Sequence, residues 1–162
     1  MLNLRDHINQ MLIATKGSKF DISLESNTAK IANKFSSLIK NGDIVFFYGE
    51  IGVGKTTFIR YLINNFQKKK KIRLTEVTSP TFNLVNEYEI KEIIVKHFDL
   101  FRIKNKEETK SIGLFENSKD FLTLVEWPEK IYSKPKNRIE LIFKYKKNST
   151  KRSLQINFLR EE

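Results

Sequence analysis

The chain has 162 residues, enough for one domain with a hydrophobic core, and hydrophobic residues make up 40% of it. Charged residues contribute 30%, and together with the hydrophobic content this balance argues against a wholly disordered chain. There is no cysteine, which excludes disulfides and thiolate metal sites and fits a reducing cytoplasm. No apolar run approaches the ~18 residues that span a bilayer. Charged residues interrupt the N-terminus at positions 5–7, so we expect neither a membrane span nor a signal peptide.

The formal net charge of +11 indicates a polyanionic partner, which could be a nucleotide, tRNA or DNA. Lysine, asparagine and isoleucine are abundant, as an A/T-rich coding sequence would also produce. The net charge therefore has two interpretations: direct contact with tRNA through a basic surface, or the base composition of the gene alone. The lysine run at 68–71 fits a binding patch or a solvated connector, and the connector is favoured.

Residues 1–19 are predicted to be an N-terminal extension of a domain that spans 20–162. Apolar residues recur in the extension at helical spacing, which predicts a short helix containing Leu4, Ile8, Met11 and Leu12. Residues 20–26 alternate as a strand does. The serine–asparagine pair at 26–27 can then cap a helix that runs to about Lys40.

The next segment alternates a buried strand with an amphipathic helix. Residues 44–49 are continuously apolar, which is typical of a strand buried on both faces of a parallel sheet. Residues 55–66 place their apolar side chains on one side of a helix. A glycine-rich segment lies between these two elements.

The second half of the chain is dominated by strands. Two extended runs, 82–90 and 93–101, meet at Lys91 and Glu92, which predicts a hairpin, and Ser79-Pro80 marks a loop before them. Three further segments follow: a helical or irregular stretch at 105–118, an apolar strand at 121–127, and a C-terminal antiparallel hairpin formed by 138–145 and 153–159. Helices and strands alternate in the first half of the chain, whereas consecutive strands dominate the second half. The predicted fold class is therefore α/β with a mixed sheet.

Residues 49–57 read GEIGVGKTT and match the phosphate-binding loop pattern of nucleoside triphosphatases. Glycine lets backbone N–H groups approach phosphate oxygens, and the start of the next helix adds free amides and the positive end of its dipole. Lys55 would reach the β- and γ-phosphates, and the hydroxyl of Thr56 would coordinate Mg²⁺. The alternative is a plain glycine turn, which the flanking strand and helix disfavour. The predicted nucleotide-binding residues are Gly49, Gly52, Val53, Gly54, Lys55, Thr56 and Thr57.

Two carboxylates are candidates for the chemistry. Glu126 ends an apolar strand, where parallel sheets face a ligand crevice, and it could hold Mg²⁺ or simply pair with a lysine. Asp99 could orient the attacking water, although the residues alone favour a turn acid paired with Arg102. We expect His97 to be a packed strand residue without a metal role, and Trp127 to anchor the core or the rim. The loop TSPT at 78–81 could sense the γ-phosphate or form a capping turn.

Five motifs stand in order along the chain: GEIGVGKTTF (49–58), SPTFNLVNEYE (79–89), HFDLFR (97–102), SIGLFE (111–116) and LVEWPEK (124–130). The series resembles the bacterial TsaE family, also called YjeE, over about residues 20–160. That resemblance implies a small ATPase required for threonylcarbamoyladenosine (t6A) modification of tRNA. It also implies a single P-loop NTPase-like domain with a mixed, largely parallel sheet flanked by helices.

The resemblance implies two protein partners, TsaB and TsaD, of which TsaD transfers the threonylcarbamoyl group to adenosine 37 of tRNA. ATP hydrolysis would reset that complex, and the isolated subunit would be a weak ATPase that contacts tRNA indirectly. Lys55 would contact phosphate, Thr56 and Glu126 would hold Mg²⁺, and Asp99 would be the catalytic or water-positioning acid. The loop SPTF would act as a switch, and Lys151 or Arg152 would approach the nucleotide.

Two positions depart from the family pattern. Phe101 stands where the family usually has tyrosine, and the acids before the GL motif are reduced to Glu107 and Glu108. The sequence therefore predicts a cytoplasmic Mg²⁺-dependent ATPase subunit of the t6A machinery. The alternatives are a small P-loop kinase, which the scattered arginines disfavour, and a nonhydrolytic nucleotide-sensing module, which the two carboxylates disfavour.

Overall fold

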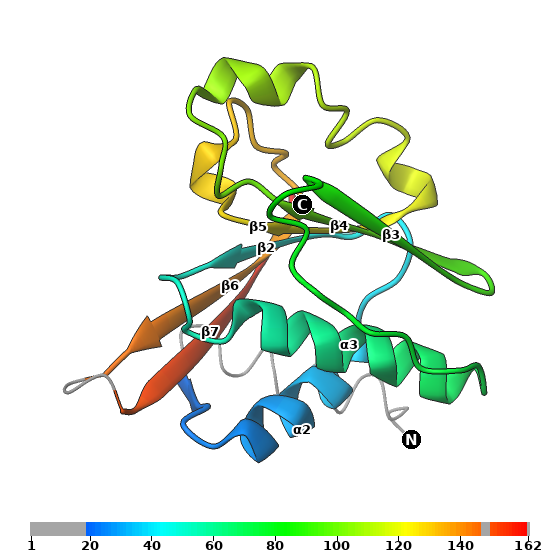
Figure 1. Cartoon of the computed structure of the whole chain (residues 1–162), viewed down its shortest axis with the longest axis vertical. Coiled ribbons are helices and arrows are strands. Elements are labelled where there is room, and N and C mark those ends of the chain that lie inside the picture. Colours follow the sequence, from blue (N-terminus) through cyan, green and yellow to red (C-terminus); the bar gives the residue numbers. More distant parts are fainter. Residues whose placement is uncertain (1–18, 147–149, 162) are drawn as a thin grey trace.

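A computed structural model describes residues 19–146 and 150–161. Within these residues one sheet has the strand order β1-β7-β6-β2-β5-β4-β3 (Figure 1). The four central strands are parallel, whereas the β7–β6, β1–β7 and β3–β4 pairs are antiparallel. The predicted α/β fold with a mixed sheet is confirmed. The strands are β1 (Lys19–Asp21), β2 (Ile44–Tyr48), β3 (Val85–Ile90), β4 (Ile93–Asp99), β5 (Leu122–Glu126), β6 (Arg138–Tyr145) and β7 (Arg152–Leu159).

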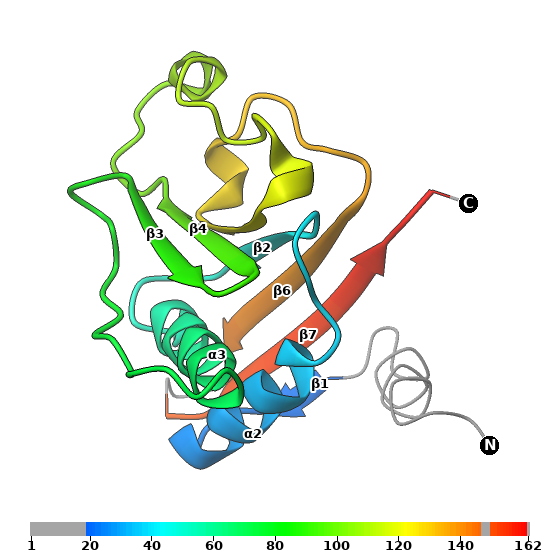
Figure 2. The same ribbon diagram turned by 90° about the vertical axis from the view of Figure 1, so that its right-hand side faces the viewer.

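Two α-helices cover one face of the sheet, as Figures 1 and 2 show: α2 (Glu25–Ser36) and α3 (Lys55–Lys69). Phe58 of α3 is fully buried, and its ring centre lies 5.8 Å from that of Phe35 in α2. It also lies 6.0 Å from the ring of Phe47 and 5.9 Å from that of Phe143, both in the sheet. The apolar stripe predicted for this helix is therefore confirmed as the face that fixes α3 on the sheet.

The prediction for the end of α2 was wrong. The helix was expected to reach about Lys40, but it ends at Ser36. Leu38 and Ile39 are nevertheless buried beyond its end, so the apolar pattern continues where the helix does not. The ammonium of Lys69, which lies on α3, donates a hydrogen bond to the Ser36 hydroxyl at 2.8 Å. The turn after α2 is thus held by a contact between helices that no local pattern shows.

The other face of the sheet is covered by the segment between β4 and β6, with its short 3₁₀ helices (Figure 1). Phe46 and Val125 from the sheet pack there with Leu114 and Ile131. Because both faces are covered, β2 is buried along nearly all of its length, as its apolar run predicted. The short helices are η1 (Lys106–Lys110), η2 (Ser118–Asp120) and η3 (Pro128–Lys130).

Both predicted hairpins are confirmed. Strands β3 and β4 pair from Val85 opposite Phe98 to the turn at 91–92, and β6 and β7 pair along their whole lengths. The first predicted strand is shorter than expected, because the carboxylate of Asp21 accepts a hydrogen bond from Ser23 N at 2.8 Å and turns the chain. The helix predicted within residues 1–19 lies outside the described residues. No helix in the described part of the chain is long and apolar enough to cross a bilayer.

Candidate active site

The glycine-rich loop connects the carboxyl end of β2 to the start of α3 and has a shape that requires glycine. Gly49, Gly52 and Gly54 have φ values of 147°, 75° and 115°. A Cβ on Gly49 would lie 2.8 Å from Val53 Cγ1 and 2.9 Å from the backbone oxygen of Phe143, so even alanine collides there. Gly54 is the N-cap of α3 and provides no side-chain cap, which leaves the first-turn amides facing the loop.

Lys55, the first residue of α3, folds back over this loop. Its ammonium donates hydrogen bonds to the carbonyl oxygen of Gly49 and, at 3.0 Å, to that of Glu50. The same nitrogen lies 4.2 Å from the centre of the Trp127 ring. Burial lowers the pKa of Lys55, while the charges of nearby acids, Glu126 foremost, oppose that shift. A desolvated cation therefore lies against the glycine-rich loop, which favours an anionic ligand.

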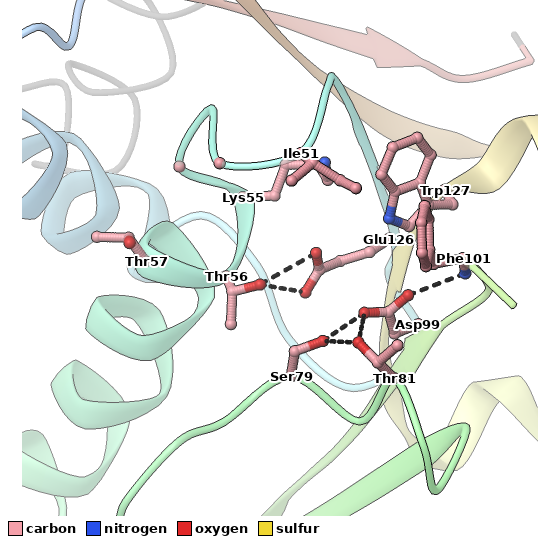
Figure 3. A pocket seen from close by; sticks show the side chains of 12 residues that line it. Ile51, Lys55, Thr56, Thr57, Ser79, Thr81, Asp99, Phe101, Glu126 and Trp127 are labelled. Atoms are coloured by element: carbon pink, nitrogen blue, oxygen red, sulfur yellow. Dashed lines mark hydrogen bonds between the residues drawn. The ribbon is translucent and has the colours of Figure 1, made fainter.

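Glu126 is the last residue of β5 and is almost fully buried. The hydroxyl of Thr56 lies 2.9 Å and 3.1 Å from its two carboxylate oxygens (Figure 3). The imidazole Nε2 of His97 lies 2.8 Å from Oε1 of the same carboxylate. The alternative in which Glu126 pairs with a lysine is not found among the salt bridges of the described residues. Instead, the carboxylate is fixed against the first turn of α3.

Asp99 ends β4 and lies directly opposite Glu126 in the parallel register with β5. Its Oδ2 accepts hydrogen bonds from the hydroxyls of Ser79 and Thr81, the latter at 2.9 Å (Figure 3). Its Oδ1 accepts one from the backbone N–H of Phe101 at 2.9 Å. The loop at 78–81 therefore holds a carboxylate, an arrangement that neither of its two interpretations contained.

The alternative partner of Asp99, Arg102, lies elsewhere. Its guanidinium carbon stands 5.0 Å from the centre of the Phe82 ring, and no salt bridge among the described residues joins it to Asp99. The interpretation of Asp99 as a turn acid paired with Arg102 was therefore wrong. The carboxylate instead faces the same cavity as Glu126.

These groups surround one cavity of about 340 Å³. Figure 3 shows the Thr57 side chain pointing away from the two carboxylates, so the backbone is what Thr57 offers the site. Val53 is buried beneath the loop, and its N–H already donates to Glu50 O at 3.3 Å. The lining residues are Ile51, Gly52, Gly54, Lys55, Thr56, Thr57, Ser79, Thr81, Asp99, Phe101, Glu126 and Trp127.

Arg152 lies beside the glycine-rich loop and does not line the cavity. Its Nη1 stands 4.0 Å from the position that a Cβ on Gly54 would take, and its guanidinium carbon lies 5.6 Å from the centre of the Tyr145 ring. Lys151 is exposed and directly precedes β7, which begins at Arg152. Of the two basic residues expected near the nucleotide, Arg152 is thus placed against the loop.

The donor set suits Mg²⁺, which prefers oxygen ligands and retains several waters or phosphate oxygens. The hydroxyl of Thr56 and the carboxylates of Glu126 and Asp99 are all oxygen donors that face one cavity. Among the described residues, no three histidine or acidic side chains are arranged to hold a metal ion. Water or phosphate oxygens would complete the coordination of a magnesium ion held by these side chains.

Comparison with known proteins identifies the family. Residues 22–154 match the family described as "Threonylcarbamoyl adenosine biosynthesis protein TsaE". The chain belongs to the TsaE family. It is 38% identical over 108 residues to a relative from Rickettsia bellii, covering 67% of this chain and 72% of the relative. It is 34% identical over 106 residues to one from Aquifex aeolicus, covering 65% and 73%. Both are named tRNA threonylcarbamoyladenosine biosynthesis protein TsaE.

The fold of this TsaE-family chain is also found in the crystal structure of Bacillus subtilis YdiB. The TM-score is 0.63 at 22% identity, covering 88% of this chain and 85% of YdiB. At that identity the likeness concerns the fold alone.

Sequence reasoning missed the contacts of two side chains in this TsaE-family site. His97 was expected to be a packed strand residue, and it is fully buried, but it also contacts Glu126. The available signal was the spacing of His97 and Asp99, since residues two apart on a strand face the same side. Trp127 adopts φ = 61°, which is unusual for a large side chain. Its ring centre lies 4.2 Å from the Lys55 ammonium and 5.1 Å from the ring centre of Phe101, contacts that the sequence did not indicate.

Proposed function

We propose that this protein is a Mg²⁺-dependent ATPase subunit of the t6A machinery, which hydrolyses ATP to support turnover of a TsaB–TsaD threonylcarbamoyl transferase. The observation that carries the proposal is the hydrogen bonding of Thr56, at the head of α3, to both carboxylate oxygens of Glu126. In phosphate-loop enzymes a hydroxyl at this position and an acid at the end of a strand hold the magnesium ion. Asp99, in register beside Glu126, supplies a second carboxylate for the nucleophile.

Each residue has a part in this chemistry. The loop amides and the Lys55 ammonium bind the phosphates, whose oxygens replace the carbonyl groups of Gly49 and Glu50 as partners of the ammonium. Thr56 and Glu126 hold Mg²⁺, which supplies positive charge to the phosphate oxygens. Asp99 orients the attacking water, because three hydrogen bonds fix its carboxylate at the cavity wall. Positioning and electrostatic stabilisation are the main means of catalysing phosphoryl transfer.

Exposed apolar side chains near the cavity support a protein partner. Ile51 and Phe101 line the cavity and are 66% and 41% exposed, and Phe82, in the loop that holds Asp99, is 85% exposed. Clustered apolar surface of this kind marks interaction sites. A TsaB-like or TsaD-like subunit that covers these residues would exclude water from the site, so hydrolysis would be weak without it. Contact with tRNA is indirect in this proposal, and the role implies a cytoplasmic location.

Phosphate release in the presence and absence of TsaB-like and TsaD-like proteins tests the proposal. We expect Glu126→Ala and Asp99→Ala each to lower the partner-stimulated rate at least ~10-fold, because metal holding and water positioning are lost. Asp120→Ala is the matched control, since this exposed carboxylate precedes the opposite end of β5. Wild-type rates in both site variants would contradict the assignment. ATP consumption that depends on a small-molecule acceptor would indicate a kinase, and nucleotide binding without phosphate release would indicate a sensor.

Direct tRNA contact is the alternative interpretation that the net charge of +11 leaves open. The isolated chain would then bind tRNA with an affinity that falls steeply with salt concentration, because released counterions drive such binding. Binding of tRNA that requires the two partner proteins would support the indirect role.

A further inference from the structure

The imidazole of His97 is a buried polar group to which the proposed mechanism assigns no role. His97 is fully buried on β4, and its Nε2 lies 2.8 Å from Glu126 Oε1. Its other ring nitrogen, Nδ1, has no hydrogen-bond partner among the described residues. A buried polar side chain that makes one hydrogen bond, to one functional carboxylate, is oriented by that contact.

The arrangement determines which nitrogen carries the hydrogen in the neutral ring. Hydrogen on Nδ1 would bury an unpaired donor and turn the Nε2 lone pair toward the Glu126 carboxylate. Hydrogen on Nε2 gives Oε1 a donor and leaves an unpartnered acceptor, which is the less costly of the two defects. His97 therefore donates to Glu126 through Nε2.

We propose that His97 is a positioning residue, which holds Glu126 through Oε1 so that the carboxylate faces Thr56 and the magnesium site. The inference rests on the proposed metal role of Glu126. Buried carboxylates are stable when their oxygens accept hydrogen bonds, and the two side-chain donors here are Thr56 and His97. Thr56 is itself a proposed metal ligand, so His97 is the donor that stays with the carboxylate whatever Thr56 binds. Partners of this kind orient metal ligands, and their loss typically costs 10–100-fold in metal affinity.

Three substitutions separate hydrogen bonding from packing. His97→Gln retains an amide N–H near the position of Nε2. His97→Leu keeps similar apolar bulk without a donor. The side chain of His97→Asn is shorter, so its amide falls short of Glu126. It serves as the second variant without a donor to Glu126, here called donor-free, if the leucine variant does not fold. Gln67→Leu is the control, because Gln67 is equally buried and bonds Thr75, but it lies twelve residues along α3 from Lys55, at the far end of the helix.

The measurement is nucleotide affinity with and without Mg²⁺, read from the fluorescence of Trp127, the single tryptophan, which lines the cavity. Without Mg²⁺ we expect all variants to bind ADP within about 2-fold of wild type, because the phosphate loop is unchanged. The Mg²⁺ concentration at half-maximal enhancement should rise at least ~10-fold in His97→Leu or His97→Asn. It should stay near wild type in His97→Gln and Gln67→Leu.

Each outcome bears on a different step. A wild-type Mg²⁺ midpoint in the donor-free variants would overturn the positioning role and leave the proposed ATPase function intact. An equal loss in His97→Gln would show that ring packing matters and the Nε2 donor does not, which also overturns it. If the wild-type protein binds nucleotide without any Mg²⁺ effect, the proposed metal role fails, and the inference fails with it.

Discussion

Replacement of Gly49 by alanine tests the phosphate-binding loop most directly. A Cβ there would lie 2.8 Å from Val53 Cγ1 and 2.9 Å from Phe143 O, and the φ of 147° belongs to a region that side chains rarely adopt. The unfavourable backbone costs about 1–3 kcal/mol, and overpacking costs about 1–3 kcal/mol more. The loop can relieve part of this total strain of about 2–6 kcal/mol by moving, but it then departs from the shape proposed to bind phosphate. Even 2 kcal/mol corresponds to about 30-fold in affinity.

We therefore expect Gly49→Ala to weaken ADP binding by at least ~30-fold in a Trp127 fluorescence titration. Gly42→Ala is the matched control, because Gly42 also has a positive φ, 95°, but its Cβ would meet nothing closer than Lys119 O at 3.6 Å. This control should lower the free energy of unfolding in urea by about 1–2 kcal/mol and leave ADP affinity unchanged. ADP affinity within about 3-fold of wild type in Gly49→Ala would refute the argument that backbone shape at this residue creates the site.

Two further predictions concern charge. Lys55→Ala should weaken ATP binding at least ~10-fold, because charge-assisted hydrogen bonds to phosphate are lost, and an unchanged ATP titration would argue against the phosphate role. Burial, with Glu140 nearby, raises the pKa of Tyr48 to about 12. The unfolded phenol loses its proton near its ordinary pKa of 10.0, so the free energy of unfolding should fall as pH rises from there to about 12. In an absorbance titration of the folded protein, Tyr48→Phe should remove one phenolate that forms at high pH. The free energy of unfolding of this variant should fall less with pH than that of the wild type. An unaltered absorbance titration would contradict the raised pKa.

The parts of the site that were predictable are those that lie in local patterns. The phosphate-binding loop is contiguous, and its strand–loop–helix context shows in the apolar run at 44–49 and the amphipathic helix after it. Glu126 was recognisable because an apolar strand ends on it, and the strand it ends is indeed parallel to β2. Such features need no knowledge of how distant segments meet.

The features that were missed depend on strand order and on chain paths. Ser79 lies twenty residues before the Asp99 carboxylate that it contacts, so its partner follows from the route of the loop over the sheet. The contact between His97 and Glu126 requires β4 to lie beside β5 in the observed register. The sequence of one strand alone predicts neither its neighbour in the sheet nor its register. The end of α2 was missed for a related reason, since the buried residues after Ser36 keep a helical apolar spacing outside the helix.

The C-terminal hairpin of β6 and β7 explains why the glycine-rich loop keeps its shape. The backbone oxygen of Phe143, in β6, comes so close to the loop that residue 49 has no room for a side chain. Two residues further along the strand, the Tyr145 hydroxyl donates to the carbonyl oxygen of Ile51 at 3.2 Å. Arg152, paired with Tyr145 across the hairpin, reaches the side of Gly54. The C-terminal hairpin thus lies against the loop at Gly49, Ile51 and Gly54. We therefore expect substitutions in the hairpin to alter the loop, and the phosphate binding proposed for it, without touching the carboxylates.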